Sequence, residues 1–165
     1  MKYYKDFERE YEKALYKNDK KTLAYFASFG KNPNQAIRNI CQYQANLACG
    51  FMAPFREENG WLQNERIETE TLPIMEGSNY MSIKVGKLPN DRWVAESSVY
   101  IELGGYSSPV SVFSDSYSTR EEAILKQLER IKNYINKNTK NPSAYLKFTD
   151  SFWHKLYAQQ IELFN

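Results

Sequence analysis

The 165-residue sequence predicts an α+β domain, in which N-terminal helices precede a central antiparallel meander of about four strands and C-terminal helices that pack on this sheet. Apolar residues recur at steps of three and four near both ends of the chain, which is typical of amphipathic helices, and alternate with polar residues in the middle, which is typical of strands. Hydrophobic residues make up 42% of the chain and supply enough material for a core. A chain of this length usually forms one core, so we expect residues 1–165 to make a single domain.

Three helices are expected in the first third of the chain. Helical spacing over residues 4–15 and again over residues 23–27, separated by the turn-favouring pair Asn18-Asp19, predicts a helical hairpin. Asn32-Pro33 is a favourable helix start, and we expect Pro54 to end or bend the helix that follows. The expected apolar face of this third helix consists of Ile37, Ile40, Cys41, Gln44, Leu47, Ala48 and Phe51.

Alternation begins after residue 61 and predicts strands. Met81, Ile83 and Val85 alternate with polar residues, and residues 93–103 alternate over the longest stretch. Gly104-Gly105 predicts a tight hairpin turn, after which residues 109–113 are expected to return as an antiparallel strand.

Two helices are expected after the sheet. Ser118 stands three residues ahead of Glu121, the spacing of a capping box, and predicts a helix that ends near residues 136–138. Asn141-Pro142 predicts a last helix, either continuous or broken at Thr149-Asp150. The apolar stripe of the first of these helices is Ala123, Ile124, Leu128, Ile131 and Ile135.

The formal charge of +2 is unevenly distributed along the chain. Residues 1–60 carry a net charge of +3, residues 61–118 carry −4 and residues 119–165 carry +3. This asymmetry fits distinct surfaces for distinct partners and equally fits ordinary solvated faces.

The cysteines and the N-terminal residues favour a cytoplasmic protein. Cys41 and Cys49 are eight residues apart in one predicted helix, about 12 Å, whereas a disulfide needs Cα atoms within roughly 7 Å. Free thiols suit a reducing compartment. The first residues are charged where a signal peptide would be apolar, and no apolar run approaches the ~20 residues of a membrane span.

Catalytic and metal-binding patterns are scarce in the sequence. His154 is the only histidine, the spacing of the two cysteines matches no zinc motif, and no glycine-rich phosphate loop is present. We therefore predict a protein that is not an enzyme and needs no cofactor. A small enzyme that uses Cys41 or His154 as its reactive group is an alternative.

Two groups of residues are candidates for binding. The helix after Ser118 places Lys126, Arg130 and Lys137 within about 40° of one another and opposite the apolar stripe, where they could follow a phosphate backbone. An ordinary solvated helix surface explains them equally well. We call the basic candidates for nucleic-acid or partner binding the basic ridge: Lys126, Arg130, Lys132, Lys137 and Lys140.

The second candidate is apolar. Phe51, Met52 and Phe55 cluster where the third helix is expected to break, and aromatic residues and Met are favoured at protein interfaces. These side chains form a candidate partner-binding surface, or they turn inward and fill the core.

One stretch suggests a biological setting. The residues from Trp93 through Gly104-Gly105 to Thr119-Arg120-Glu121-Glu122-Ala123 resemble the strand-hairpin-helix arrangement of small uncharacterised accessory proteins of phages and conjugative elements. The resemblance covers only residues 93–124 of the 165-residue chain. It implies a compact binding protein that acts on a host nucleic-acid-handling protein, as anti-restriction and anti-CRISPR proteins do, and it assigns no individual binding residue.

The sequence therefore predicts a non-enzymatic binding protein with a protein partner, acting as a mobile-element inhibitor or accessory factor. Direct binding of RNA or DNA through the basic ridge is the first alternative.

Overall fold

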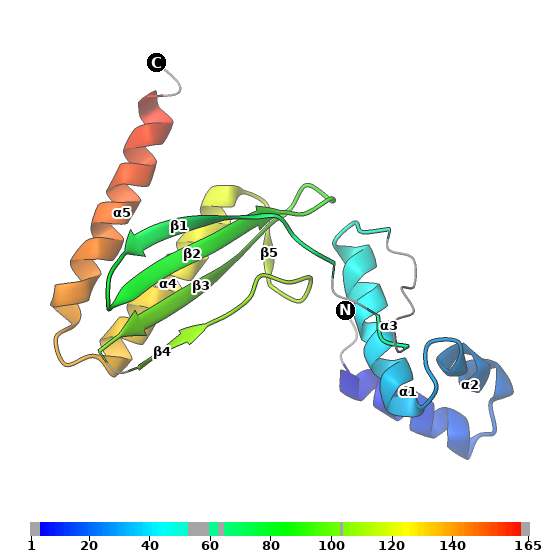
Figure 1. The fold of residues 1–165 in the computed structure, drawn as a ribbon. Helices are drawn as coiled ribbons and strands as arrows, with labels where there is room; N and C mark the ends of the chain where they lie inside the picture. Colours follow the sequence, from blue (N-terminus) through cyan, green and yellow to red (C-terminus); the bar gives the residue numbers. More distant parts are fainter. Residues whose placement is uncertain (1–3, 53–59, 63–64, 103, 163–165) are drawn as a thin grey trace. The chain divides into compact units, whose positions relative to one another are not determined.

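The computed structural model describes residues 4–52, 60–62, 65–102 and 104–162, and the chain divides into two compact units. The helical unit comprises Met1–Arg66 with Ser111–Phe113, and the sheet unit comprises Ile67–Val110 with Ser114–Asn165. N-terminal helices, a central antiparallel sheet and C-terminal helices follow one another along the chain, which confirms the predicted α+β class (Figure 1). That residues 1–165 act as one domain stays a prediction.

The helical unit contains α1 (Tyr4–Tyr16), α2 (Lys20–Ala27) and α3 (Pro33–Ala48), so the predicted helical hairpin and third helix are confirmed. Side-chain caps fix where α2 and α3 begin. Asp19 Oδ1 accepts hydrogen bonds from the backbone amides of the second and third residues of α2, at 3.1 Å each. Asn32 Oδ1 accepts from the amide of Gln35 at 3.0 Å. The apolar core of the unit consists of Phe7, Phe26, Phe29, Ala36, Ile37 and Ile40.

The predicted end of α3 at Pro54 is wrong, because the helix ends earlier, at Ala48. Gly50 adopts a φ of 86°, and its amide donates to the carbonyl of Leu47 at 3.0 Å. The amide of Phe51 donates to the carbonyl of Asn46 at 2.9 Å, which completes a Schellman motif. Glycine at this position reaches the left-handed conformation without the steric cost that a Cβ atom brings.

The predicted apolar face of α3 is also partly wrong. Leu47 is 48% exposed and Ala48 is exposed, although both were assigned to the core. Amide side chains occupy the buried face instead, next to the apolar ones. The buried polar residues of α3 are Gln35, Asn39, Gln42 and Asn46.

The sheet unit contains a five-stranded antiparallel sheet. Its strands pair in the order β1-β2-β3-β4, which confirms the predicted meander, and β5 pairs with β3 beyond the end of β4. The strand bounds are β1 Thr69–Met75, β2 Tyr80–Lys87, β3 Trp93–Ile101, β4 Gly104–Ser107 and β5 Ser116–Tyr117.

The predicted hairpin at Gly104-Gly105 is wrong in position. Both glycines lie inside β4, the turn contains Glu102 with a φ of 57°, and residues 109–113 form no strand. A Cβ atom on Gly105 would overlap the carbonyl oxygen of Val99 on β3. Gly105 therefore allows the backbones of β3 and β4 to approach closely, and a glutamate, Glu102, takes the positive φ in the turn.

Two helices complete the sheet unit: α4 (Arg120–Asn138) and α5 (Pro142–Glu162). The cap of α4 is Thr119, one residue after the predicted one, and its Oγ1 accepts from the amide of Glu122 at 3.1 Å. The helix α5 runs without interruption past Thr149-Asp150. The hydroxyl of Thr149 donates to the carbonyl of Leu146 at 2.7 Å, which satisfies this side chain inside a helix.

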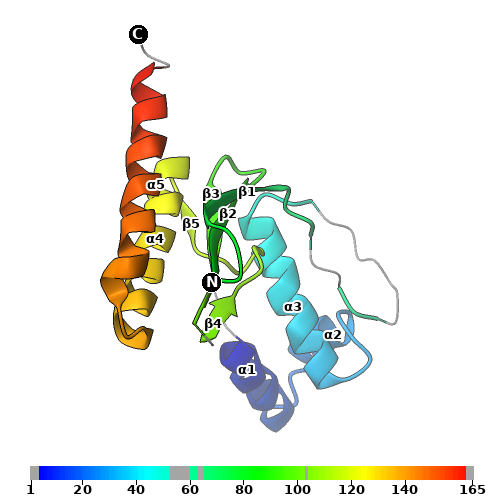
Figure 2. The same ribbon diagram turned by 60° about the vertical axis from the view of Figure 1, so that its left-hand side comes forward.

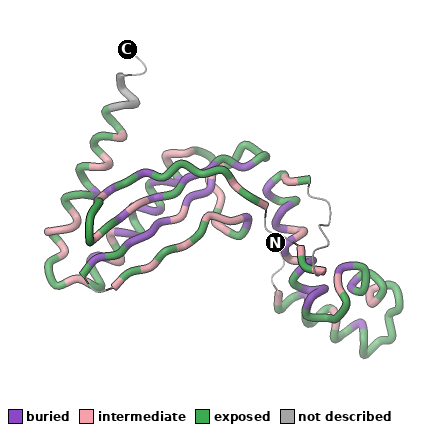
Figure 3. Tube along the Cα trace, viewed as in Figure 1, coloured by how far each residue is buried: buried purple, intermediate pink, exposed green. Residues whose placement is uncertain are grey.

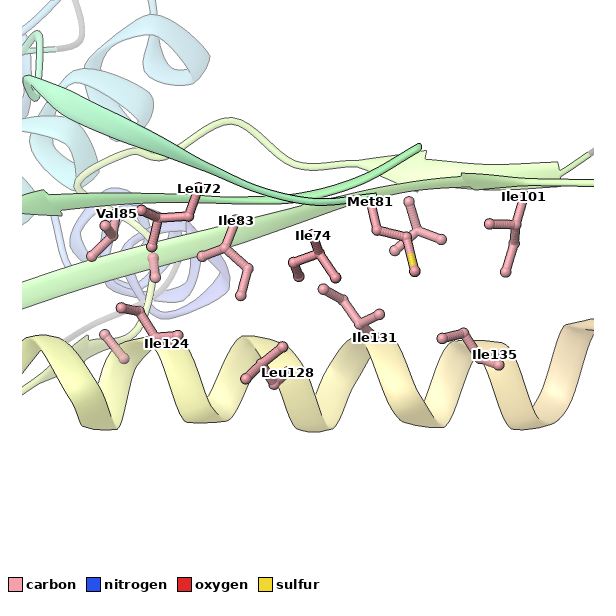
Figure 4. Close-up of a cluster of buried hydrophobic side chains, with 13 residues drawn as sticks. Leu72, Ile74, Met81, Ile83, Val85, Ile101, Ile124, Leu128, Ile131 and Ile135 are labelled. Carbon is pink, nitrogen blue, oxygen red and sulfur yellow. The ribbon is translucent and has the colours of Figure 1, made fainter. Parts of the chain in front are cut away.

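Both helices pack on the same side of the sheet, which Figure 2 shows close to edge-on. The labelled side chains of the strands point toward α4 in Figure 4, and every member of the predicted stripe of α4 is buried. Buried residues alternate with more exposed ones over most of β2, whereas β3, in the middle of the sheet, is buried at most positions (Figure 3). The core cluster consists of Leu72, Ile74, Met81, Ile83, Val85, Ala95, Val99, Ile101, Ala123, Ile124, Leu128, Ile131 and Ile135.

Candidate functional site

The face of the sheet that points away from α4 is the strongest candidate for a binding surface. Met81, Ile83 and Val85 are buried beneath α4, so the alternating residues of β2 lie on the other face. No helix described in the sheet unit packs there, because α5 contacts the same core cluster as α4. We call it the open face; it carries Thr69, Thr71, Pro73, Tyr80, Ser82, Lys84, Gly86, Val94, Glu96, Ser98, Tyr100, Gly105 and Ser107.

Two tyrosines lie on the central strands of the open face. Tyr80 of β2 and Tyr100 of β3 are directly paired across the ladder, and their rings stack with centroids 6.0 Å apart and an interplanar angle of 18°. They remain 39% and 43% exposed. Because each ring is held by its neighbour, the pair presents aromatic area that is already ordered.

Hydroxyl groups extend the open face beyond the tyrosines. Ser82 pairs with Ser98 in the ladder, and the Oγ atoms of Ser98 and Ser107 are 2.8 Å apart in a hydrogen bond. The charged residues of the face are Lys84 and its cross-strand partner Glu96, which carry opposite charges. Tyrosine, serine and glycine with few charges form the composition of protein-recognition surfaces such as antibody paratopes.

Sequence reasoning missed the open face, although its signal was present. Alternation placed Tyr80 and Tyr100 on the second face of their strands. A sequence pattern does not state whether a second layer covers that face. The side on which both α4 and α5 pack shows which face the helices of the sheet unit leave uncovered.

The basic ridge has most of its charge paired within the sheet unit. Lys126 Nζ lies 3.0 Å from Glu129 Oε2, and Lys132 Nζ lies 2.7 Å from Asp150 Oδ1. Lys137 and Lys140 are exposed, and neither forms an ion pair with a residue that the structure describes. Exposed pairs contribute little to stability, but each paired cation is partly neutralised toward a phosphate backbone.

Arg130 is bound to the edge of the sheet rather than directed into solvent. Its Nη1 lies 2.8 Å from Glu96 Oε2, and its guanidinium lies over the ring of Tyr106 at 4.9 Å. Burial raises the pKa of Tyr106, whose hydroxyl is hydrogen-bonded to Ser97 at 2.8 Å. The arrangement gives Arg130 a structural role, and binding by the basic ridge stays a prediction.

The apolar candidate surface is only partly described. Phe51 is half-buried, Met52 is 92% exposed, and Phe55 lies outside the described residues. An exposed Met fits an interface anchor, and the assignment stays a prediction.

Cys41 and His154 lie in different units. Burial raises the pKa of the Cys41 and Cys49 thiols, which keeps them protonated near neutral pH and makes them weak nucleophiles. Cys49 Sγ donates to the carbonyl of Val112 at 3.5 Å, and His154 is exposed on α5. Burial is the only cause of these two shifts, so no described cation lowers the pKa of either thiol.

Within the described part of the chain, no three His, Cys, Asp or Glu side chains are grouped to bind a metal ion. No described helix is long and apolar enough to cross a membrane. Comparison with protein-family models, with curated proteins and with solved structures found no match for this chain.

Proposed function

We propose that this protein is a non-enzymatic binding protein that recognises a protein partner through the open face of its sheet. The stacked and exposed pair Tyr80–Tyr100 carries the proposal. Tyrosine is among the residues that dominate the energy of protein interfaces, and ordered rings lose little conformational entropy on binding.

The biological setting of the proposal comes from the resemblance to accessory proteins of phages and conjugative elements. In that setting the partner is a host protein that handles nucleic acid, and the chain acts as an inhibitor or accessory factor. Low charge on the open face favours a protein over a nucleic acid as its ligand, because nucleic-acid affinity depends on neutralising phosphates.

The test is the double variant Tyr80→Ser with Tyr100→Ser. Proteins captured from a host lysate by the wild type are identified, and the affinity of the purified partner is then measured for each variant. We expect the double variant to lose about 2 kcal/mol or more, roughly thirtyfold in affinity. Both rings are exposed, so the free energy of unfolding should change by no more than about 1 kcal/mol.

The matched control removes two tyrosines that are more exposed and lie elsewhere, Tyr16→Ser with Tyr157→Ser. This control should retain the partner. Equal affinity of the wild type and the Tyr80/Tyr100 variant would contradict the proposal. A nuclease-sensitive ligand that is lost in Lys137→Glu with Lys140→Glu would favour direct nucleic-acid binding instead.

A further inference from the structure

The chemistry of one end of the open face indicates what kind of partner binds there. At this end, the backbone amide of Glu102 donates to Asn79 Oδ1 at 2.9 Å and joins the turn after β3 to the turn before β2. Tyr80 follows Asn79 directly, and Tyr100 precedes Glu102 by two residues, about 7 Å along a strand. The stacked tyrosines therefore adjoin both turns.

Two exposed carboxylates lie in these turns, Glu76 and Glu102. Neither forms an ion pair with a described residue, whereas Glu70, Glu96 and Asp150 each have a cationic partner. Lys147 of α5 lies over the ring of Phe148 at 5.2 Å and forms no ion pair with Glu76. Glu76 and Glu102 thus have no ion-pair partner among the described residues.

A pocket of about 420 Å³ adjoins the turn before β2. The loop from Glu76 to Asn79 lines one part of it, and Phe148 and Pro73 line another. Neither tyrosine lines this pocket, so it is not part of the arginine site. An exposed aromatic pair flanked by two carboxylates is suited to a side chain that is both planar and cationic. Arginine fits because its guanidinium stacks on aromatic rings and pairs with carboxylates through a fixed fork of donors.

We infer that this end of the open face binds an arginine-bearing segment of the protein partner, with a guanidinium on the Tyr80–Tyr100 pair and Glu76 and Glu102 as its counter-charges. The inference rests on the proposed function and adds the chemistry of the ligand. Charge complementarity selects this occupant, since two exposed carboxylates without an ion-pair partner attract a basic segment and repel phosphate.

The test uses a short synthetic peptide of alternating arginine and glycine, with the same peptide carrying citrulline in place of arginine as its neutral control. Ring signals of Tyr80 and Tyr100 are followed by NMR in the full chain and assigned with single Tyr→Phe variants. We expect the arginine peptide to shift both signals, with an affinity that falls as salt rises, and the citrulline peptide to shift neither.

The carboxylates are tested with Glu76→Gln and Glu102→Gln together, which should weaken arginine-peptide binding by about tenfold. The control is Glu68→Gln with Asp115→Asn, which removes two other exposed carboxylates from the same unit and should leave the affinity unchanged. The variant Glu102→Gln keeps the length of the side chain at a residue with positive φ.

Three results would overturn the inference: equal binding of the citrulline peptide, unshifted ring signals, or ring signals that move with single-stranded oligothymidylate but not with the arginine peptide. The proposed function fails separately. If partner capture still depends on Tyr80 and Tyr100 while the arginine peptide does not bind, the open face remains the interface and only its cationic ligand is wrong.

Discussion

The helical unit and the sheet unit bury different kinds of side chain. Between the sheet and α4 the core is almost entirely aliphatic, whereas α3 turns amide side chains inward beside aromatic residues. Asn39 shows the consequence: its Nδ2 donates to the carbonyls of Phe29 at 2.6 Å and Gly60 at 2.8 Å, and its Oδ1 accepts from the amide of Leu62 at 2.9 Å. Aliphatic burial holds the sheet unit together, and hydrogen bonds to loop backbone supplement it in the helical unit.

The largest effect is expected from Ile131→Ala in the sheet unit. Ile131 is fully buried in the middle of the α4 stripe, so its truncation should lower the free energy of unfolding by about 2–5 kcal/mol. Denaturant titration measures the change. Leu125→Ala, on the exposed side of the same helix, should change stability by no more than about 0.5 kcal/mol. Equal losses in the two variants would mean that α4 packs through another face.

The next effect is expected from Asn39→Ala in the helical unit. Two carbonyls and one amide lose their partner, so we expect a loss of about 2–3 kcal/mol although the side chain is polar. Gln44→Ala on the same helix is the control, because Gln44 is half-buried and its side chain forms no hydrogen bond with a described residue. Similar stability of the two variants would show that the hydrogen bonds of the buried Asn39 amide do not raise the free energy of unfolding.

Hydrogen exchange on Ile131→Ala and Asn39→Ala also addresses domain organisation. If each substitution lowers protection only in its own unit, the units unfold separately and the single-domain prediction is wrong. If both units lose protection in either variant, the chain unfolds as one domain.

The smallest effect is expected on the basic ridge. Arg130→Ala removes a half-exposed ion pair with Glu96 and the contact with Tyr106, and should cost about 0.5–1 kcal/mol. Lys137→Ala should be neutral within about 0.5 kcal/mol, because Lys137 has no ion-pair partner among the described residues. Thermal melting distinguishes the two, and a neutral Arg130→Ala would remove the structural role assigned to this residue.

The same comparison explains what could be predicted from the sequence. The stripe of α4 was predicted correctly because its buried positions are mostly apolar and follow the helical period. The strand β3 was predicted from its alternation, although residues on both of its faces are buried. The face of α3 was partly wrong because amides replace apolar residues at buried positions, and the sequence does not reveal which loops they bind.

The roles of Gly104-Gly105 and of Arg130 could not be predicted from the sequence, for different reasons. Gly104-Gly105 has the sequence of a tight turn, but its function is close approach to β3, which depends on a backbone brought near by folding. The helical spacing of Lys126 and Arg130 was read correctly, yet the partner of Arg130 lies on a strand far along the chain. The open face likewise depends on a tertiary fact, the side of the sheet on which the helices pack.

The position of α4 after the sheet has a consequence for synthesis. The strands leave the ribosome before α4 does. Strands β1 to β3 each pair with the next one across a short connection, so the meander can form early. Until α4 emerges, Met81, Ile83, Val85 and Val99 form an uncovered aliphatic surface on the nascent chain. Over that interval the newly made sheet has the exposed apolar surface that chaperones bind and that promotes aggregation, and the arrival of Ile124 to Ile135 ends it.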